Sequence, residues 1–371
     1  MNQSSYIKIK PPSLEHEKIL EKVTNNQRIS VEEGLLLIKS KTNEELLFLK
    51  SLIDWVYETK LGKKVFFSST LYLYPTNQCV FNCSFCSFYA KPGSTNKWFH
   101  TPENLIKRIK YYKDFITEVH IVGGCWPKCD LNYYSQLFSL IRENYPLIHI
   151  KALSAIEYDY LSRLHKISLE EVFSKLKMSG LQSIPGGGAE ILVDKVRKQI
   201  SGQRISSERF LEIHSIAHKQ NIPSNVTMLF DHIETPKDII THLDLIRRQQ
   251  DLTSGFKNFI PLKFAKLNNS LGKLVNKRNL SNKLNIKAIY ATARLMLDNI
   301  PNIKSLWNYL GIDNGLKMLN WGCNDFSSTH LEEKVFFYAS SETPIRMDIQ
   351  GMHSLLKSIG KEPILTNSQK V

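Results

Sequence analysis

The chain has 371 residues, of which 42% are hydrophobic, 23% charged and 10% aromatic. This composition is that of an ordinary globular protein, and it excludes collagen-like, disordered and coiled-coil proteins. No run of about 18 apolar residues exists, so we expect no transmembrane helix. The N-terminal sequence MNQSSYIKIKPP lacks the apolar core of a signal peptide. We therefore expect a cytoplasmic protein that has no membrane partner.

The charge balance is basic, with 49 Lys and Arg against 35 Asp and Glu and a formal net charge of +14. Such an excess of positive charge can favour binding to nucleic acid, to a membrane surface or to anionic small molecules. The densest basic stretch, residues 272–287, has few apolar residues and is predicted to be a solvated loop. Because no nucleic-acid recognition motif accompanies the charge, we expect no nucleic-acid partner.

The first 65 residues are predicted to be a helical extension. Ser30 is followed three residues later by Glu33, which is the pattern of a capping box before a helix. Residues 42–60 carry apolar side chains at helical spacing. We therefore assign residues 1–65 to an N-terminal helical extension.

From Val65 onward, strand patterns alternate with amphipathic helix patterns. The expected strands are Leu71–Pro75, Glu118–Val122, Ile148–Ala152, Leu181–Ile184, Ser224–Leu229 and Phe259–Phe264, with weaker ones near Lys304–Leu310 and Leu316–Asn320. The expected helices are Thr101–Phe115, Leu131–Glu143, Ser168–Ser179, Ser206–Gln220, Pro236–Asp251 and Lys283–Asp298. This alternation predicts an α/β protein with a closed, TIM-type (β/α)8 barrel over residues 66–325, and a doubly wound open sheet is the alternative. Residues 326–371 are expected to be a C-terminal helical segment that packs on the barrel.

Glycine and polar residues gather directly after the expected strands. They are Thr76–Asn77, Gly123–Gly124, Ser154, Gly186–Gly188 and Asp231–Glu234. In a barrel the carboxyl ends of all strands share one face, where active sites are built. We therefore expect these residues to form one site.

Three cysteines are the most informative feature of the sequence. Cys79, Cys83 and Cys86 follow the first expected strand with the spacing C-x3-C-x2-C. Thiolates bind soft metals and iron–sulfur clusters. Structural zinc prefers paired C-x2-C knuckles, and the sequence has no second knuckle. Three thiolates on one loop can hold three irons of a [4Fe-4S] cluster and leave the fourth iron open to a substrate. The alternative is that the three cysteines are free thiols that bind no metal.

The other cysteines have no such spacing. Cys125 and Cys129 bracket the tripeptide Trp-Pro-Lys, and they are either bystanders or a fourth ligand or redox pair. Cys323 is expected to be structural. His214 and His218, spaced like a zinc pair, lack the Glu of H-E-x-x-H and are expected to be ordinary surface or core histidines.

Several polar residues beyond the strands are candidates for binding and proton transfer. His232 could act as a proton shuttle, and Glu234 could orient its ring. The alternative is that both residues belong to a capping turn before Pro236. Glu157 could bind the hydroxyls of a ribose, and the alternative is that its carboxylate is structural. Arg197 could bind a carboxylate with two hydrogen bonds, and the alternative is that it is a solvated charge on a helix. Gly187 lies in a triple-glycine run that lets the backbone approach a ligand or forms a plain turn.

The cysteine loop after the first strand and Gly123–Gly124 after the second resemble the radical S-adenosylmethionine (SAM) superfamily. The resemblance implies that Cys79, Cys83 and Cys86 ligate a [4Fe-4S] cluster and that Gly123 and Gly124 receive the methionine amino group of SAM. Ser154, Glu157 and Gly187 stand on the same expected face, and we assign them to SAM binding too.

The resemblance extends over roughly residues 30–365. It points to the subgroup of aminodeoxyfutalosine synthases, dehypoxanthine futalosine cyclases and deazaflavin FO synthases, on the segments Thr76–Cys79, Cys86–Tyr89, Glu118–Gly124, Ile148–Ala152, Ser183–Ile191, Arg294–Asn299 and Asn324–Asp325. Segments 223–229, 232–236 and 259–262 favour the aminodeoxyfutalosine synthases. The sequence departs from the pattern at Cys125-Trp126, where Leu-His is usual, and at Asp231, where Gly is usual.

The resemblance implies a reaction, two cofactors and two partners. The reaction joins the 5′-deoxyadenosyl group of SAM, a co-substrate, to an enolpyruvyl benzoate, 3-[(1-carboxyvinyl)oxy]benzoate, and gives 6-amino-6-deoxyfutalosine for menaquinone biosynthesis. A flavodoxin or ferredoxin serves as electron donor. We expect His232 to act as acid, base or hydrogen-bond donor beside Glu234, and Arg197 to anchor a substrate carboxylate. The alternatives are a cyclase-type radical SAM enzyme and a non-enzymatic iron–sulfur or zinc protein with a fourth ligand from Cys125 or Cys129.

Overall fold

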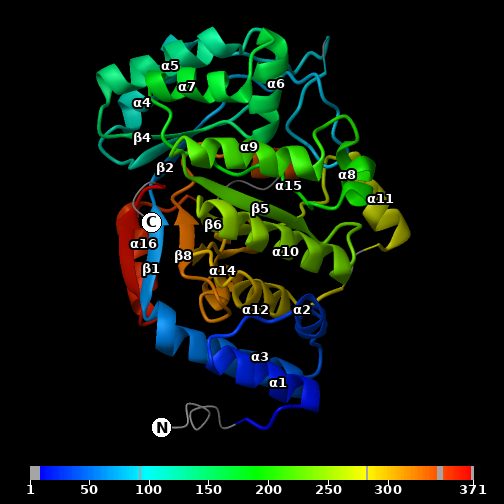
Figure 1. Ribbon diagram of the computed structural model, residues 1–371. Helices are drawn as coiled ribbons and strands as arrows, with labels where there is room; N and C mark the ends of the chain where they lie inside the picture. Colours follow the sequence, from blue (N-terminus) through cyan, green and yellow to red (C-terminus); the bar gives the residue numbers. More distant parts are fainter. Residues whose placement is uncertain (1–8, 92, 281–282, 341–345, 369–371) are drawn as a thin grey trace.

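The computed structural model describes residues 9–91, 93–280, 283–340 and 346–368 (Figure 1). Helices precede the first strand, as the sequence predicts: α1 (Leu14–Thr24), α2 (Val31–Ile38), α3 (Asn43–Val56) and the π-helical turn η2 (Tyr57–Leu61). The capping box at the start of α2 is confirmed, because the Glu33 N–H donates to Ser30 Oγ at 3.2 Å and the Ser30 N–H donates to Glu33 Oε2 at 2.6 Å. These helices lie against one end of the barrel (Figure 1).

Parallel strands form a closed ring, which confirms the predicted barrel. The strands are β1 (Lys64–Ser68), β2 (Thr70–Leu73), β3 (Glu118–Ile121), β4 (His149–Ala152), β5 (Ser224–Phe230), β6 (Phe256–Lys263), β7 (Asn302–Ile303), β8 (Asp325–Ser328) and β9 (Glu362–Thr366). Three sheets, β2-β3-β4, β5-β6-β7 and β8-β1-β9, are joined by isolated parallel bridges. Lys151 and Ile184 bridge β4 to β5 through residues 183–184, Lys304 bridges to β8, and Leu331 bridges back to β2.

The predicted strands near the C-terminal half need correction. Residues 181–184 contribute only single bridges, and residues 316–320 are not a strand, because α14 (Ile312–Met318) occupies most of them. The strand that completes the barrel is β8, and the boundary drawn at residue 325 falls inside its span. The segment after residue 325 is not purely helical, since it also contains β9.

The base of the barrel is completed by β9. It pairs in parallel with β1 over five residues, and Phe66 lies opposite Ile364. Ser368, just beyond β9, donates to Glu118 Oε2 from its N–H at 2.8 Å and from its hydroxyl at 2.7 Å. Lys151 Nζ donates to the same hydroxyl at 2.9 Å. Glu118 and Lys151 form a buried ion pair inside the barrel, so residues far apart in sequence close its lower end.

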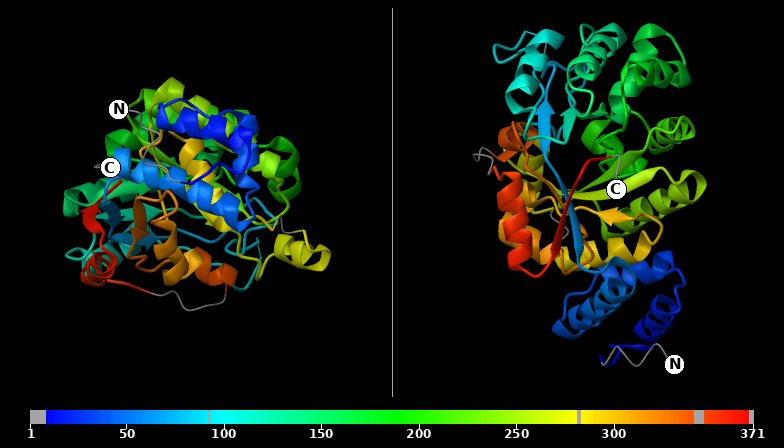
Figure 2. Two further views of the ribbon diagram at one scale, coloured as in Figure 1. Left: turned by 90° about the horizontal axis from the view of Figure 1, so that it is seen from below. Right: turned by 90° about the vertical axis from the view of Figure 1, so that its left-hand side faces the viewer.

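Helices surround the ring (Figures 1 and 2). They are α4 (Pro102–Tyr112), α5 (Leu131–Asn144), α6 (Ala155–His165), α7 (Leu169–Ser179), α8 (Asp194–Ser201), α9 (Ser207–Lys219), α10 (Pro236–Thr253), α11 (Ser270–Arg278), α12 (Ile286–Met296), α13 (Trp307–Leu310), α14, α15 (Val335–Ser340) and α16 (Ile349–Ser358). The expected solvated loop at residues 272–287 is therefore partly wrong, because α11 covers its first half; residues 281 and 282 lie outside the described residues. Among the described residues, no helix combines the length and apolar composition needed to cross a membrane.

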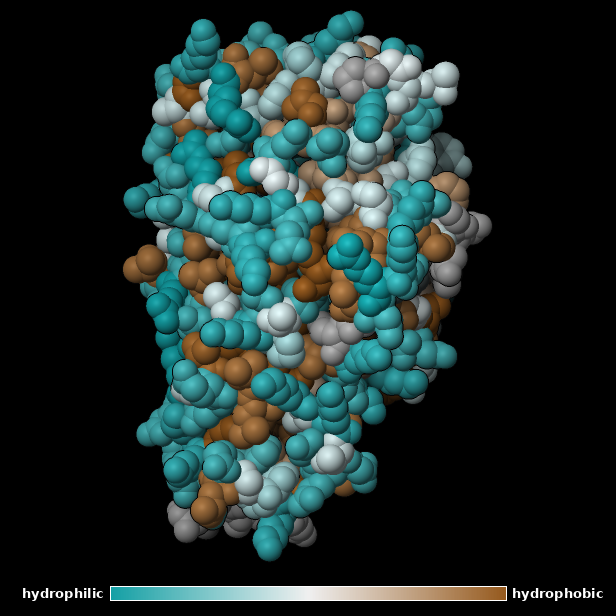
Figure 3. Space-filling view, turned by 90° about the vertical axis from the view of Figure 1, so that its right-hand side faces the viewer, coloured by the Kyte–Doolittle hydropathy of each residue, from teal (hydrophilic) through white to brown (hydrophobic). Residues whose placement is uncertain are grey.

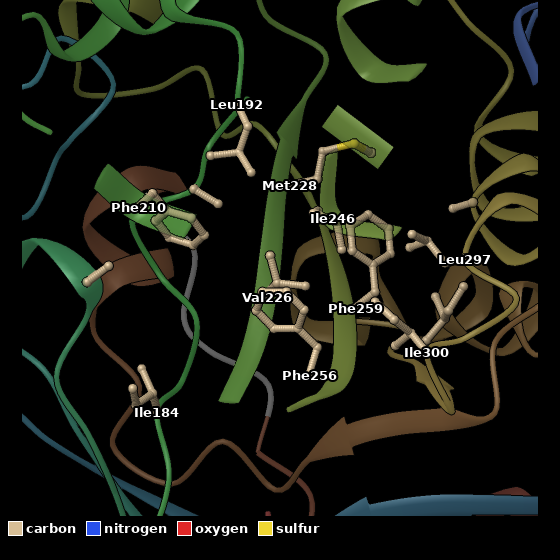
Figure 4. Close-up of a cluster of buried hydrophobic side chains, with 14 of the residues drawn as sticks. Ile184, Leu192, Phe210, Val226, Met228, Ile246, Phe256, Phe259, Leu297 and Ile300 are labelled. Carbon is tan, nitrogen blue, oxygen red and sulfur yellow. The ribbon is translucent and has the colours of Figure 1, made fainter. Parts of the chain in front are cut away.

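Along β5, side chains that face the hydrophobic core alternate with side chains that face a cavity inside the barrel. Val226 and Met228 are fully buried and gather with Ile246 of α10 and Phe259 of β6 (Figure 4). The intervening Asn225 and Thr227 line a cavity inside the barrel. Successive side chains of a strand point to opposite faces, so one set packs on the helices and the other faces the site. Burying a side chain such as Phe259 contributes about 2 kcal/mol of transfer free energy.

Candidate active site

The cysteine loop lies directly after β2 and encloses a small cavity. Cys79, Cys83 and Cys86 line this space of about 110 Å³, which we call the cluster cavity, together with aromatic side chains of the same loop. Asn77 holds the loop in place, because its side chain accepts the Trp98 N–H at 2.9 Å and donates to the Asn96 carbonyl at 3.0 Å. The loop is thereby fixed on the carboxyl side of the strands, where the sequence places it.

The three thiols have the chemistry of cluster ligands. All three are free cysteines. The Cys125 thiol donates to Cys79 and lowers the pKa of Cys79 to about 6, whereas burial raises the pKa of Cys83 to about 12 and also raises that of Cys86. Within the described ranges no group of three or more His, Cys, Asp or Glu side chains converges on a point that would hold a single metal ion. Thiolates that ligate three irons of a cluster stand around it, and three cysteines that line one cavity fit that arrangement.

The remaining cysteines differ in position. Cys125 is buried beside Cys79 and lines the cluster cavity. Cys129 is buried in the hydrophobic core, and Cys323 lies near the N-terminal helices, where its carbonyl accepts the Tyr57 hydroxyl at 2.6 Å. The described lining of the cluster cavity therefore adds one further thiol, Cys125, to the three of the motif.

The ends of β3 and β4 meet beside the cysteines, as the sequence predicts. Glu157, at the start of α6, accepts the Gly123 N–H at 3.0 Å through Oε1. Its Oε2 accepts the N–H and the hydroxyl of Ser154, both at 2.7 Å. The carboxyl is buried, and this burial raises its pKa to about 7. Gly123, Ser154 and Glu157 thus form one hydrogen-bonded unit.

Gly124 and Gly187 of the candidate site differ in how much room the protein leaves for a side chain. A Cβ on Gly124 would lie 2.0 Å from the Gln78 carbonyl oxygen and 3.0 Å from Cys79 Cβ. Gly124 is therefore required by the close approach of the chain's own cysteine loop. A Cβ on Gly187 would meet only Ser154 Cβ, at an ordinary 3.6 Å, so packing within the protein does not require glycine there.

A second cavity of about 310 Å³ runs into the barrel, and we call it the barrel cavity. Gly123, Ser154, Glu157 and Arg204 line both this cavity and the cluster cavity, so the two spaces adjoin. Arg204 pairs with Glu190 at 2.6 Å and lies over the Phe85 ring at 5.5 Å. A ligand at this shared wall would reach both the thiols and the barrel interior.

The barrel cavity is lined by residues that the sequence reasoning missed. Tyr72 stacks between His120, at a ring-centroid distance of 4.7 Å, and His330, at 5.8 Å. Lys151 pairs with Glu118, and Lys304 pairs with Asp325 at 2.7 Å. Burial holds the pKa of His330 at about 3 and that of His120 well below its usual range, so both rings are neutral near pH 7. The signal was present in the alternation of apolar and polar residues along EVHI and HIKA, because polar strand positions in a barrel face inward.

Three predicted catalytic residues do not reach either cavity. Arg197 is 4% exposed, and its guanidinium donates to the carbonyls of Gly188, Ala189 and Ile205. His232 donates through its ring to the Leu229 carbonyl at 3.0 Å and approaches Glu234 at 3.1 Å, and both side chains are fully buried. Glu234 accepts the N–H groups of residues 231 and 232, which is the capping turn weighed as the alternative. None of the three lines either cavity, and their contacts are those of structural residues, so their catalytic roles stay predictions.

The chain is similar to known proteins over both of its halves. Residues 73–246 match the family description "Radical SAM superfamily", and residues 253–371 match "CofH/MqnC C-terminal region". An aminodeoxyfutalosine synthase of Thermus thermophilus is 36% identical over 93% of this chain and 92% of the relative.

The chain belongs to the radical SAM superfamily.

Further relatives place this radical SAM protein among enzymes of similar chain length. An aminodeoxyfutalosine synthase of Streptomyces coelicolor is 30% identical over 94% of this chain and 92% of the relative. A cyclic dehypoxanthine futalosine synthase of the same organism is 34% identical over 78% of this chain and 71% of the relative. The subgroup that the sequence resembles is thereby confirmed. Membership implies a [4Fe-4S] cluster and SAM as cofactors, and the three thiols around one cavity fit that requirement.

Solved structures confirm the barrel fold of this radical SAM protein. Methylornithine synthase has a TM-score of 0.71 at 19% identity, covering 93% of this chain and 96% of the other. The hydrogenase maturase HydG has a TM-score of 0.72 at 15% identity, covering 94% of this chain and 76% of the other. At these identities the likeness concerns the fold alone.

Proposed function

We propose that this chain is an aminodeoxyfutalosine synthase, which joins the 5′-deoxyadenosyl group of SAM to 3-[(1-carboxyvinyl)oxy]benzoate. The reaction proceeds with aryl migration and loss of the carboxylate carbon as CO2 or bicarbonate, and gives 6-amino-6-deoxyfutalosine. The observation that carries the proposal is the match to two synthases of that name over more than nine tenths of the chain. A [4Fe-4S] cluster, when bound, supplies the single electron that cleaves SAM, and a flavodoxin or ferredoxin would deliver that electron.

We assign the cluster to Cys79, Cys83 and Cys86. These three cysteines line one cavity. The rest of its lining is aromatic, apolar or glycine, except for Cys125, Ser154, Glu157 and Arg204.

We assign SAM to the shared wall of the two cavities. Gly123, Ser154 and Glu157 stand there beside the thiols. Glu157, with a pKa of about 7, is available either as an ionised acceptor or as a proton-bearing donor near neutral pH. Gly187 lines the barrel cavity next to Ser154 and leaves room for a ligand.

We assign the benzoate substrate to the deeper part of the barrel cavity. Its aromatic ring finds stacking partners in the row formed by His120, Tyr72 and His330. Its two carboxylates find the ammonium groups of Lys151 and Lys304, each of which is held in place by a buried carboxylate. Lys304 and Lys151 replace Arg197 as candidate anchors, because they line the cavity and Arg197 does not.

Product analysis tests the proposal. The protein is reconstituted with iron and sulfide without oxygen and given SAM, dithionite and the enolpyruvyl benzoate. We expect mass spectrometry to show a product that contains both the adenosyl group and the aryl group. Free 5′-deoxyadenosine without that adduct would contradict the proposal and favour hydrogen abstraction of the cyclase type. Intact SAM with a full complement of iron would contradict radical SAM chemistry altogether.

A further inference from the structure

Cys83 separates two spaces of the molecule. On one side it lines the cluster cavity, and on the other it lines a surface hollow of about 190 Å³ formed with Asn82, Ser84 and residues 199–203. Among the described residues that line this hollow, Cys83 is the sole cysteine. Cys83 is partly exposed, as are Cys79 and Cys86, and it is the residue that the cluster cavity and this hollow share.

The hollow is held rigidly between α8 and α11. The Ser84 N–H donates to the Ile200 carbonyl at 2.9 Å, and its hydroxyl donates to the same oxygen at 3.0 Å. The Ser84 carbonyl in turn accepts the Leu271 N–H at 2.8 Å and the Ser270 hydroxyl at 3.1 Å. The end of α8 and the start of α11 therefore meet at the residue next to Cys83, and the two helices lie side by side in Figure 1.

The surface around the hollow is strongly basic. The exposed charged residues of α8 and α11 are the cations Lys195, Lys198, Lys273, Lys277 and Arg278 and one acid, Asp194. The Asp194 carboxylate is occupied by the N–H and hydroxyl of Ser207, both at 2.8 Å. The cysteine loop, residues 79–91, contains no Asp or Glu. Figure 3 faces this side of the molecule, where hydrophilic residues form a broad area with hydrophobic residues between them.

We propose that the hollow beside Cys83 and the basic surface of α8 and α11 form the docking site of an acidic electron-carrier protein. The inference rests on the proposed function, because the cluster must be reduced by one electron before it can cleave SAM. The carrier loses one electron and the cluster gains it, and no bond or proton is transferred. Cys83, as a cluster ligand, gives this electron a covalent path from the hollow to the iron.

Charge gives this surface its specificity. Complementary charge steers association and fixes the orientation of weakly bound partners, and its effect falls steeply with ionic strength. An acidic carrier would thus place its prosthetic group over the hollow. A small reductant such as dithionite needs no such surface, because it can reach the cluster by diffusion.

Two charge-reversal variants and a matched control test the docking site. The variants are Lys195→Glu with Lys198→Glu on α8, and Lys273→Glu with Lys277→Glu on α11. The control is Lys107→Glu with Lys110→Glu, two exposed lysines of α4 on the opposite side of the molecule in Figure 1, which changes the net charge equally. The probe is a flavodoxin of net negative charge, whose oxidised form is titrated into each reconstituted protein by calorimetry. SAM cleavage is then measured with reduced flavodoxin and, separately, with dithionite.

We expect the Kd for flavodoxin to rise by about tenfold or more in both reversal variants at low salt, and the difference to shrink at about 0.5 M salt. SAM cleavage with dithionite should stay at the wild-type rate. Unchanged flavodoxin affinity in both variants, or an equal loss in the α4 control, would overturn the docking site. Charge-dependent flavodoxin binding by a protein that fails to cleave SAM with dithionite would support the docking site and contradict the proposed function instead.

Discussion

The carboxylate of Glu157 accepts the backbone N–H of Gly123 at 3.0 Å and thereby joins the end of β4 to the end of β3. The same carboxylate holds both the N–H and the hydroxyl of Ser154. One side chain thus fixes the relative position of three groups that we assign to SAM. Its position is a property of the protein alone, since all three bonds are internal.

Replacement of Glu157 by Gln should weaken SAM binding without loss of the cluster. The amide has one acceptor oxygen where the carboxyl has two, so either Gly123 or Ser154 loses its partner. We expect the Kd for SAM to rise about tenfold, which is about 1.4 kcal/mol. Anaerobic equilibrium dialysis measures the affinity, and iron analysis checks the cluster. Glu103→Gln at the exposed start of α4 is the control, and equal affinities in wild type and Glu157→Gln would contradict the assignment.

The titration of Glu157 should also make the free energy of unfolding depend on pH. Burial raises the pKa of this carboxyl in the folded protein to about 7 from an ordinary value of 4.5. A raised pKa means that the folded state favours the protonated form, so the associated stability is present below about pH 4.5 and is lost as the pH rises through 7. Without SAM, the stability of wild type relative to Glu157→Gln should fall between about pH 5 and pH 8, by about 3 kcal/mol at most. Thermal unfolding across this range measures it, and a flat difference would contradict it.

Replacement of Cys79, Cys83 or Cys86 by Ala should each abolish the cluster. A cluster held by three thiolates loses a required ligand in each variant. Iron content and visible absorption after reconstitution measure the loss. Cys129→Ala and Cys323→Ala should retain about four irons per chain. Loss of iron in Cys129→Ala would contradict the three-ligand assignment.

Gly124→Ala should prevent formation of the cluster, whereas Gly187→Ala should not. The added Cβ at residue 124 would lie 2.0 Å from the backbone of Gln78 and would displace the cysteine loop. The same addition at residue 187 meets no atom closer than 3.6 Å. Iron content after reconstitution distinguishes the two variants. Similar iron in both would show that the loop tolerates displacement.

His232→Gln and Arg197→Met should lower stability and leave catalysis intact. Both side chains satisfy buried carbonyls, and each buried carbonyl left without a donor costs about 1–3 kcal/mol. We expect lower melting temperatures, with kcat per folded molecule within about twofold of wild type. A selective rise in KM for the benzoate in Arg197→Met would restore the role that the sequence suggested.

The sequence predicted those parts of the site whose chemistry is local. The three thiols share one short loop, and Gly123 and Ser154 each follow a strand with clear alternation, so their meeting follows from the barrel itself. Arg197 and His232 could not be placed this way, because helix rotation and turn geometry decide where they point. Residues 316–320 are a short run with three apolar residues, and such a run is equally compatible with the helix that covers residues 316–318.

The pairing of β1 with β9 has a consequence for synthesis on the ribosome. Phe66 and its partner Ile364 are separated by about 300 residues, and the chain between them contains the whole ring. Nascent chains emerge at about 5–20 residues per second, so β1 waits for many seconds with one edge unpaired. An exposed strand edge is a template for association with other chains. Until residue 366 has left the ribosomal tunnel, the nascent barrel is therefore a substrate for chaperones that shield strand edges.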